Sequence, residues 1–435
     1  MVLAAILAPL ICLPQAQATP YDVQERLQRF EVAWQMTADK TKRKASLQKM
    51  PNMPHELITS NFGAICQKLD AAVDALQGSE PRSARAVSIR CLPAVIAPGQ
   101  KATVVASWAY VTESTKPVRV SVGGTSVTLE PGKSRSFSVS VVPPGGSADA
   151  ANQKEFGLLL SASTDGLARN AYVSVVQRAK DRVAAIEKSP IHTVRTLAKR
   201  LQQVLEQPES VEIDLPFQDY LQLAEGMNQN STPLWSLQDI PMASHESSVF
   251  RVWLPKEVCV EPSGAPEINL VVAFSGPLGS EFSFFESYGR GSAAKEAMKR
   301  NWGFVGVRSG DRSAAHVLDW ILSERKLKIK NLFVIGYSSG GPYALELMSL
   351  SRKPNGTALF APAMQSFPKE WLNQPIFYTV GSQEVGSILR NAQDIGRIYS
   401  TEPRFRFQEI DVCNHVTVPM ESMAGAYEFF DKLAN

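Results

Sequence analysis

The sequence has no strong excess of charge of either sign. Among its 435 residues, 45 Lys and Arg stand against 42 Asp and Glu, which gives a formal net charge of +3. Binding to a nucleic acid requires many cations that face phosphate groups, and so small an excess does not indicate such a surface. We therefore expect no nucleic-acid partner.

The sequence also lacks a hydrophobic run of the roughly 20 residues that cross a bilayer. The apolar run at the N-terminus is interrupted by Pro9 and is followed by Ala16-Gln17-Ala18, a small-x-small cleavage signal. This pattern predicts a signal peptide over residues 1–18 and a secreted or periplasmic mature chain that begins at Thr19. No Lys or Arg precedes the run, and a buried N-terminal strand or helix is the alternative. We expect no membrane span in the mature chain.

Cysteine is scarce, and its spacing is not that of a metal site. The cysteines beyond the predicted signal peptide are Cys66, Cys91, Cys259 and Cys413. None forms a CxxC pair or a Cys/His cluster, so we expect no zinc site. Disulfides are permitted in an exported chain, and pairing Cys66 with Cys91 and Cys259 with Cys413 would keep each bond within one predicted region. Buried free thiols are the alternative.

The sequence does contain enough apolar material for more than one core, since 44% of its residues are hydrophobic, and its length predicts two or three domains. Residues 19–84 place apolar side chains such as Val23, Leu27 and Phe30 at helical spacing, which predicts a helical region. Residues 85–178 change to short segments with a period of two, separated by Gly and Pro, which predicts an immunoglobulin-like β-sandwich. Residues 179–247 begin with a stretch rich in Ala, Lys, Arg and Leu, and we interpret them as a helical linker.

Residues 248–435 alternate apolar strands with helices. The predicted strands are 249–254, 268–274, 303–307, 331–335, 357–360, 376–380 and 405–412. Nearly continuous apolar strands with helices between them indicate a mostly parallel sheet that is covered on both faces. The predicted fold is therefore multidomain, with an α/β unit after the helical region and the sandwich.

The clearest chemical motif is Gly336-Tyr337-Ser338-Ser339-Gly340, which directly follows a predicted strand and precedes a predicted helix. A Gly-x-Ser-x-Gly motif in this setting is typical of a nucleophile elbow, a sharp turn that exposes the serine hydroxyl. The glycines allow the strand and the helix to approach closely. Backbone N–H groups at the start of that helix can stabilise an oxyanion. We predict that Ser338 is a nucleophile.

A serine nucleophile needs a base, and the base needs an acid that fixes its tautomer. His415 is the only histidine after the elbow, and it lies in a loop before the last predicted helix. Glu384 follows the strand 376–380 and lies between Ser338 and His415 in the chain. This Ser, Glu, His order is associated with α/β-hydrolases. Glu370 and Asp411 are the alternative acids, although Asp411 is close to His415 along one strand.

With these residues identified, residues 248–435 resemble the α/β-hydrolase superfamily. The segments 249–255 and 270–276 resemble the start of secreted esterases of the feruloyl esterase and polyester depolymerase kind, in which the second strand ends in a His-Gly oxyanion loop. Here the sequence is Ser275-Gly276-Pro277-Leu278-Gly279. Pro277 has no N–H, so the resemblance implies that Leu278 or Gly279 is the second oxyanion donor after Ser339. We recognise no family in the N-terminal half.

These patterns predict a secreted serine hydrolase that cleaves carboxylic esters through an acyl-enzyme, with no metal or organic cofactor. The expected substrate is a small-molecule or polymer-borne ester, and an open cleft is expected because no helical lid is evident within residues 248–435. A peptidase or amidase of the prolyl-oligopeptidase type would share the fold, but the N-terminal half has no repeats that would form a propeller. A non-catalytic binding or adhesion protein is the third interpretation.

Overall fold

The computed structural model describes residues 18–141, 155–207, 217–229, 235–241, 247–255, 257–258, 267–276, 279–308, 314–319, 327–347, 353–364 and 367–434. The predicted signal peptide therefore lies almost wholly outside the described residues. Within them, no helix combines the length and the apolar character needed to cross a membrane.

The C-terminal part of the chain is built on an eight-stranded sheet with the order β16-β15-β14-β13-β11-β12-β10-β9. The strands are β9 (Trp235–Pro241), β10 (Ser247–Trp253), β11 (Ile268–Phe274), β12 (Gly303–Val307), β13 (Ile329–Tyr337), β14 (Gly356–Phe360), β15 (Ile376–Gly381) and β16 (Phe405–Ile410). From β12 to β16 all neighbours are parallel, whereas β10 runs antiparallel to both β12 and β9. The mostly parallel sheet is as predicted.

Helices cover both faces of this sheet. One apolar core includes residues of α12 (Ala314–Asp319), α13 (Gly340–Glu346) and α14 (Gly386–Ile398), and a second includes residues of α10 (Ser283–Glu286), α11 (Tyr288–Lys299) and α15 (Val418–Ala434). The strands β12, β14 and β15 are buried at every position. Burial on both faces explains why these strands are continuous apolar runs in the sequence.

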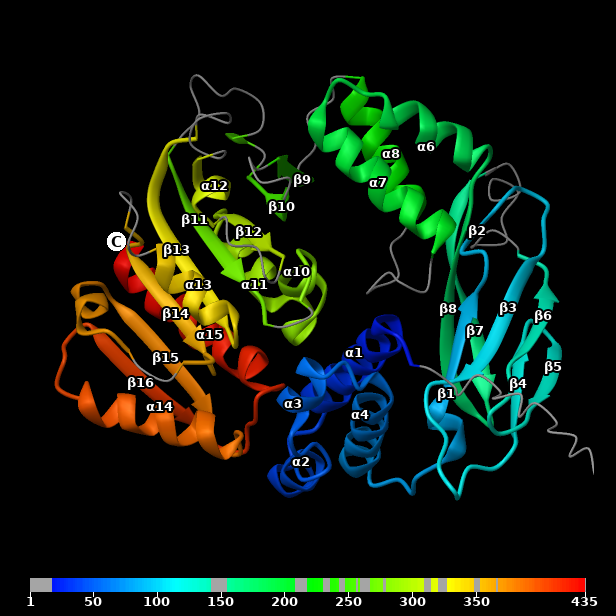
Figure 1. The fold of residues 1–435 in the computed structure, drawn as a ribbon, viewed down its shortest axis with the longest axis horizontal. Coiled ribbons are helices and arrows are strands. Elements are labelled where there is room, and N and C mark those ends of the chain that lie inside the picture. The colour runs from blue at the N-terminus through cyan, green and yellow to red at the C-terminus, as the bar shows by residue number, and fades with distance from the viewer. Residues whose placement is uncertain are drawn as a thin grey trace, which may run out of the picture.

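The N-terminal helical region consists of α1 (Pro20–Met36), α2 (Lys40–Leu47), α3 (Met53–Ile58) and α4 (Phe62–Gln77). Thr19 caps α1 in a capping box with Asp22, and Pro20 occupies the first turn, where its missing N–H costs nothing. The core of this region also includes Val416 of the C-terminal unit. Figure 1 shows these helices between the α/β unit and the strands β1 to β8.

The next region consists of two sheets that share one apolar core. One has the order β1-β3-β6 and the other β2-β8-β7-β4-β5. The strands are β1 (Val87–Cys91), β2 (Val95–Ile96), β3 (Ala102–Trp108), β4 (Val118–Val122), β5 (Thr125–Leu129), β6 (Arg135–Val139), β7 (Phe156–Thr164) and β8 (Leu167–Val175), preceded by the 3₁₀ helix η1 (Ser83–Ala86). All pairs are antiparallel except β2 with β8.

The segment interpreted as a helical linker has more structure than the sequence indicates. It contains α6 (Ala179–Glu187), α7 (His192–Glu206) and α8 (Phe217–Asn228), which share one apolar core, and Pro190 lies in the break between α6 and α7. It also contains β9, so the sheet begins before the predicted boundary at residue 248. β9 is an edge strand with Ser236, Gln238 and Asp239 in its sequence, which hides it from a search for apolar runs.

Neither proposed disulfide forms. Cys66 and Cys413 are free, buried thiols, so the pairs with Cys91 and with Cys259 are both excluded, and Cys259 itself lies outside the described residues. Burial raises the pKa of each of these two thiols to about 12. They are therefore inert, un-ionised core groups near neutral pH.

Candidate active site

Ser338 occupies a strained turn between β13 and α13. Its φ is +53°, in the left-handed region that non-glycine residues rarely adopt. A Cβ on Gly336 would lie 2.8 Å from the Cβ of Ala344, and a Cβ on Gly340 would lie 2.2 Å from the backbone oxygen of Phe274. Only glycine fits at these two positions, which explains the spacing of the motif.

The structure brings Ser338, His415 and Glu384 together. The hydroxyl oxygen of Ser338 lies 2.9 Å from Nε2 of His415, and Nδ1 of His415 lies 3.0 Å from Oε2 of Glu384. The other carboxylate oxygen, Oε1, accepts a hydrogen bond from the backbone N–H of Val385 at 2.8 Å. All three residues are buried, with exposed fractions of 5%, 3% and 7%. These contacts are those of a nucleophile, a base and an orienting acid.

Two short loops hold the base and the acid. Oδ1 of Asn414 accepts the N–H of Val416 at 3.1 Å and that of Thr417 at 3.3 Å, which fixes the turn that carries His415. A Cβ on Gly381 would lie 2.2 Å from the backbone oxygen of Cys413, so the loop of the acid and the loop of the base are in direct contact. The geometry of the pair therefore depends on backbone packing as well as on the hydrogen bond.

Tyr337 is a site residue that the sequence does not reveal. Its hydroxyl donates to the backbone oxygen of His415 at 2.9 Å, and its ring lies 5.2 Å from the imidazole, centroid to centroid. Burial raises the pKa of Tyr337 well above its usual value, so this hydroxyl remains a donor at any physiological pH. Its place directly before the serine in a Gly-x-Ser-x-Gly motif gives no indication of this role.

The other candidate acids and histidines lie elsewhere. Asp411 is exposed and forms an ion pair with Lys40 at 3.1 Å, and Glu370 is exposed in the 3₁₀ helix η5 (Lys369–Asn373). His55 is exposed on α3. The remaining histidines are His192 at the start of α7, His316 in α12, and His245, which lies outside the described residues.

Of the expected oxyanion donors, Ser339 and Gly279 lie within the described residues. Ser339 directly precedes α13, so its N–H lies at the start of that helix. The N–H of Gly279 donates to the backbone oxygen of Gly276 at 3.0 Å, a hydrogen bond that it would have to give up in order to bind an oxyanion. Leu278 lies outside the described residues.

The surroundings of His415 include a pocket that the sequence does not reveal. A cavity of about 90 Å³, here called the apolar pocket, lies beside His415 and is lined by residues from α1, α3 and α4 as well as from the α/β unit. The lining residues are Pro20, Val23, Gln24, Leu27, Met53, Leu57, Phe62, Ile65, Leu69, Gly279, Ser283, Ser287, Tyr288, Tyr337, His415 and Val416. Among the described residues, the part of the wall that lies outside the α/β unit comes from the N-terminal helices.

Comparison with known proteins gives structural matches only. No family model and no curated protein matches the chain. Solved structures that match part of it include an esterase from Pyrococcus furiosus, with 14% identity, 46% of this chain and 91% of that chain covered, and a TM-score of 0.37. The siderophore hydrolase EstB from Aspergillus nidulans matches with 14% identity, coverage of 46% and 95%, and a TM-score of 0.35.

A further match is a fluorophosphonate-binding serine hydrolase from Staphylococcus aureus, with 12% identity, coverage of 46% and 98%, and a TM-score of 0.36. The structural features of this chain indicate its fold family more specifically than these distant matches do. They are a mostly parallel sheet with helices on both faces, a strained serine turn between strand and helix, and a hydrogen-bonded Ser, Glu, His set in that chain order. In these features the C-terminal half of the chain resembles the α/β-hydrolase superfamily.

Proposed function

We propose that this chain is a serine hydrolase that cleaves carboxylic esters through an acyl-enzyme. The observation that carries the proposal is the continuous chain of hydrogen bonds from Ser338 through His415 to Glu384. A serine hydroxyl is a weak nucleophile on its own, and a base within hydrogen-bond distance activates it.

In the proposed reaction, Oγ of Ser338 attacks the ester carbonyl carbon while its proton passes to Nε2 of His415. The resulting imidazolium is stabilised by the carboxylate of Glu384. The C–O bond to the alcohol then breaks, and Nε2 returns the proton to the leaving alkoxide. Water then attacks the acyl-enzyme by the same steps, which releases the acid and restores Ser338. The N–H of Ser339, with Leu278 as the proposed second donor, stabilises the oxyanion in both steps.

The test is labelling with a fluorophosphonate, which reacts with an activated serine, followed by turnover of p-nitrophenyl esters and aminoacyl anilides. Wild type is expected to be labelled and to hydrolyse the esters in preference to the anilides. Ser338→Ala is expected to lose both labelling and turnover, whereas Ser400→Ala, an exposed serine after α14, serves as the matched control. A folded Ser338→Ala protein with undiminished turnover would exclude the mechanism, and faster cleavage of the anilides would indicate an amidase.

We further infer that residues 85–178 form a domain of immunoglobulin-like type. The support is the connectivity: β1 belongs to one sheet, while β2, the next strand, joins the other sheet beside β8. The order β8-β7-β4-β5 corresponds to a GFC sheet with an added strand, and β1-β3-β6 forms the opposing sheet. The proposal that the chain is exported is supported by Ala16-Gln17-Ala18.

A further inference from the structure

The apolar pocket places the N-terminal helices beside His415. Val23 and Leu27 of α1, Leu57 of α3 and Phe62 of α4 line it together with His415. Its lining is largely aliphatic and aromatic. Its side chains with polar groups other than His415 are Gln24, Ser283, Ser287, Tyr288 and Tyr337. Gln24 donates to the hydroxyl of Ser287, and the hydroxyl of Tyr337 donates to the backbone oxygen of His415. An environment of this kind favours an uncharged alkyl or aryl group over a polar one.

The side of α1 that faces the α/β unit is fixed by a buried carboxylate. Glu31 is fully buried, and its Oε2 accepts the backbone N–H of Arg290 at 3.2 Å. That N–H belongs to a run of four residues, Tyr288 to Gly291, that all have positive φ, and the N–H groups of Tyr288 and Gly289 also lower the pKa of Glu31. Helix α1 is thereby anchored next to Tyr288, which itself lines the apolar pocket.

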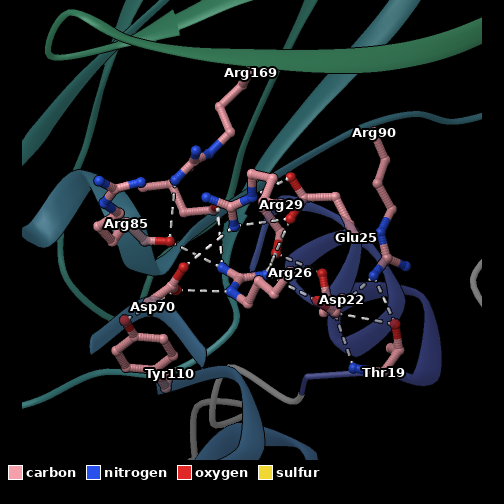
Figure 2. Close-up of polar contacts among 12 residues, drawn as sticks. Thr19, Asp22, Glu25, Arg26, Arg29, Asp70, Arg85, Arg90, Tyr110 and Arg169 are labelled. Carbon is pink, nitrogen blue, oxygen red and sulfur yellow. Dashed lines mark hydrogen bonds and ion pairs between the residues drawn. The ribbon is translucent and has the colours of Figure 1, made fainter. Parts of the chain in front are cut away.

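The opposite side of α1 is fixed to the sandwich. Figure 2 shows Arg26 of α1 between Asp22 and Asp70, close to Arg85 and Arg169. Nε of Arg26 lies 2.8 Å from Asp70, and its Nη2 donates to the backbone oxygen of Arg85 at 3.0 Å. Arg26 and Asp70 have exposed fractions of only 1% and 2%. With both sides of α1 held, the pocket is preformed rather than assembled around a ligand.

The size of the pocket limits what it can hold. An apolar cavity of roughly 150 Å³ accommodates benzene, a molecule of six carbon atoms. By that scale, a cavity of about 90 Å³ accommodates about three or four carbon atoms. A long fatty chain or an aromatic ring exceeds this volume.

We propose that the apolar pocket, roofed by α1, α3 and α4, is the specificity site for a short alkyl group of about three or four carbons in the ester substrate. This assignment rests on the proposed esterase function. It makes Val23, Leu27 and Leu57, which lie more than 280 residues before Ser338 in the sequence, specificity-determining residues of the reaction. The alkyl group belongs either to the acyl part or to the alcohol part of the ester, and the experiment separates the two.

The experiment measures kcat/KM for two ester series, p-nitrophenyl acylates from acetate to decanoate and acetate esters of alcohols from methanol to decanol. Each methylene that enters the pocket is worth about 0.8 kcal/mol, or about fourfold in kcat/KM. We expect one series to rise by about this factor per carbon up to about four carbons and then to fall. The series that shows this optimum identifies which part of the ester is bound.

Val23→Phe fills the pocket. In that series it is expected to lower the ratio of kcat/KM for the butyl substrate to kcat/KM for shorter substrates by about tenfold or more, with little loss of kcat/KM for the shortest substrate. Leu57→Ala enlarges the pocket and is expected to move the optimum to longer chains. The matched control is Val32→Phe on the same helix, where Val32 is 37% exposed and does not line the pocket; it should leave the profile unchanged.

Profiles that are flat in both series, or unchanged by Val23→Phe and Leu57→Ala while fluorophosphonate labelling of Ser338 persists, would overturn the specificity assignment and leave the hydrolase proposal intact. Absence of both labelling and ester turnover in wild type would overturn the hydrolase proposal and the assignment with it. Circular dichroism and thermal unfolding of each variant separate a change in specificity from loss of fold.

Discussion

Glu31 and Arg290 join the first helix of the chain to the α/β unit through a hydrogen bond of 3.2 Å between the side-chain oxygen of Glu31 and the backbone N–H of Arg290. The carboxyl group is completely buried, and burial raises its pKa to about 7, although the N–H groups of Arg290, Tyr288 and Gly289 favour the ionised form. The contact between the roof of the pocket and the α/β unit is therefore sensitive to pH near neutrality.

The pH dependence of stability is the first prediction. Between pH 4.5, the ordinary value for this carboxyl, and about 7, Glu31 keeps its proton in the folded chain and loses it in the unfolded chain. The folded state then binds more protons, so stability falls as pH rises through this window and levels off above it. Glu31→Gln should remove this contribution, as measured by urea unfolding at pH 5, 6, 7 and 8. The exposed Glu113→Gln is the control, and equal slopes for wild type and Glu31→Gln would contradict the prediction.

The second prediction concerns the acid of the triad. Glu384→Gln leaves Ser338 and His415 in place but removes the carboxylate that fixes the tautomer of the imidazole, and we expect kcat to fall by up to about 10⁴. Asp411→Asn and Glu370→Gln should stay within about threefold of wild type, because both carboxylates are exposed and neither is placed beside the ring of His415. Kinetics on a short p-nitrophenyl ester, with stability checked by thermal unfolding, decide between the three. A hundredfold loss in either control variant would reassign the acid.

The third prediction concerns the buried pair of Arg26 and Asp70. Arg26→Met leaves Asp70 buried without its main partner, which should cost about 3 to 5 kcal/mol of unfolding free energy. The double variant Arg26→Met/Asp70→Leu should recover part of that loss, because it leaves no uncompensated charge. Lys40→Met, in an ion pair that is 76% and 71% exposed, should change stability only slightly. Denaturant unfolding measures all three, and additive losses in the double variant would show that the two charges do not interact.

The fourth prediction concerns the N-terminus. Cleavage after Ala18 would leave Thr19 as the first residue, and its nitrogen lies 2.8 Å from Oδ2 of Asp22. The new ammonium group would then form a charge-assisted hydrogen bond at the start of α1. N-terminal sequencing of the protein purified from its source should read Thr19 first. A retained Met1 would contradict the export proposal.

Much of the α/β unit is predictable because its local patterns are strong. The strands β11 and β12 have the predicted bounds, since a strand that is buried on both faces is an uninterrupted apolar run bounded by polar residues. The position of Ser338 can be predicted because Gly336 and Gly340 are sterically required on either side of it. The order along the chain then narrows the base to His415, whereas Glu384 is only the preferred acid, with Glu370 and Asp411 as alternatives.

What the sequence does not reveal are contacts between distant segments. The spacing of Val23 and Leu27 indicates that α1 has an apolar face, but the same spacing would result from packing against any partner. Val32, another apolar residue of the same helix, is 37% exposed. Local periodicity specifies that a surface is buried and leaves open which surface covers it. The roof of the pocket and the role of Tyr337 were missed for this reason, whereas the edge strand β9 was missed because of its polar residues.

The hydrogen bond between Nε1 of Trp34 and Oε1 of Glu421, at 2.6 Å, spans 387 positions of the sequence. Because the ribosome makes the chain from its N-terminus, Trp34 emerges long before its acceptor exists. The helices α1 to α4 can pack on one another before that, but the part of α1 that faces the α/β unit has no partner until α11 and α15 have been made. The pocket beside His415 combines residues of α1, α3 and α4 with residues up to Val416, so on the proposed function it is complete only after this C-terminal segment has been made.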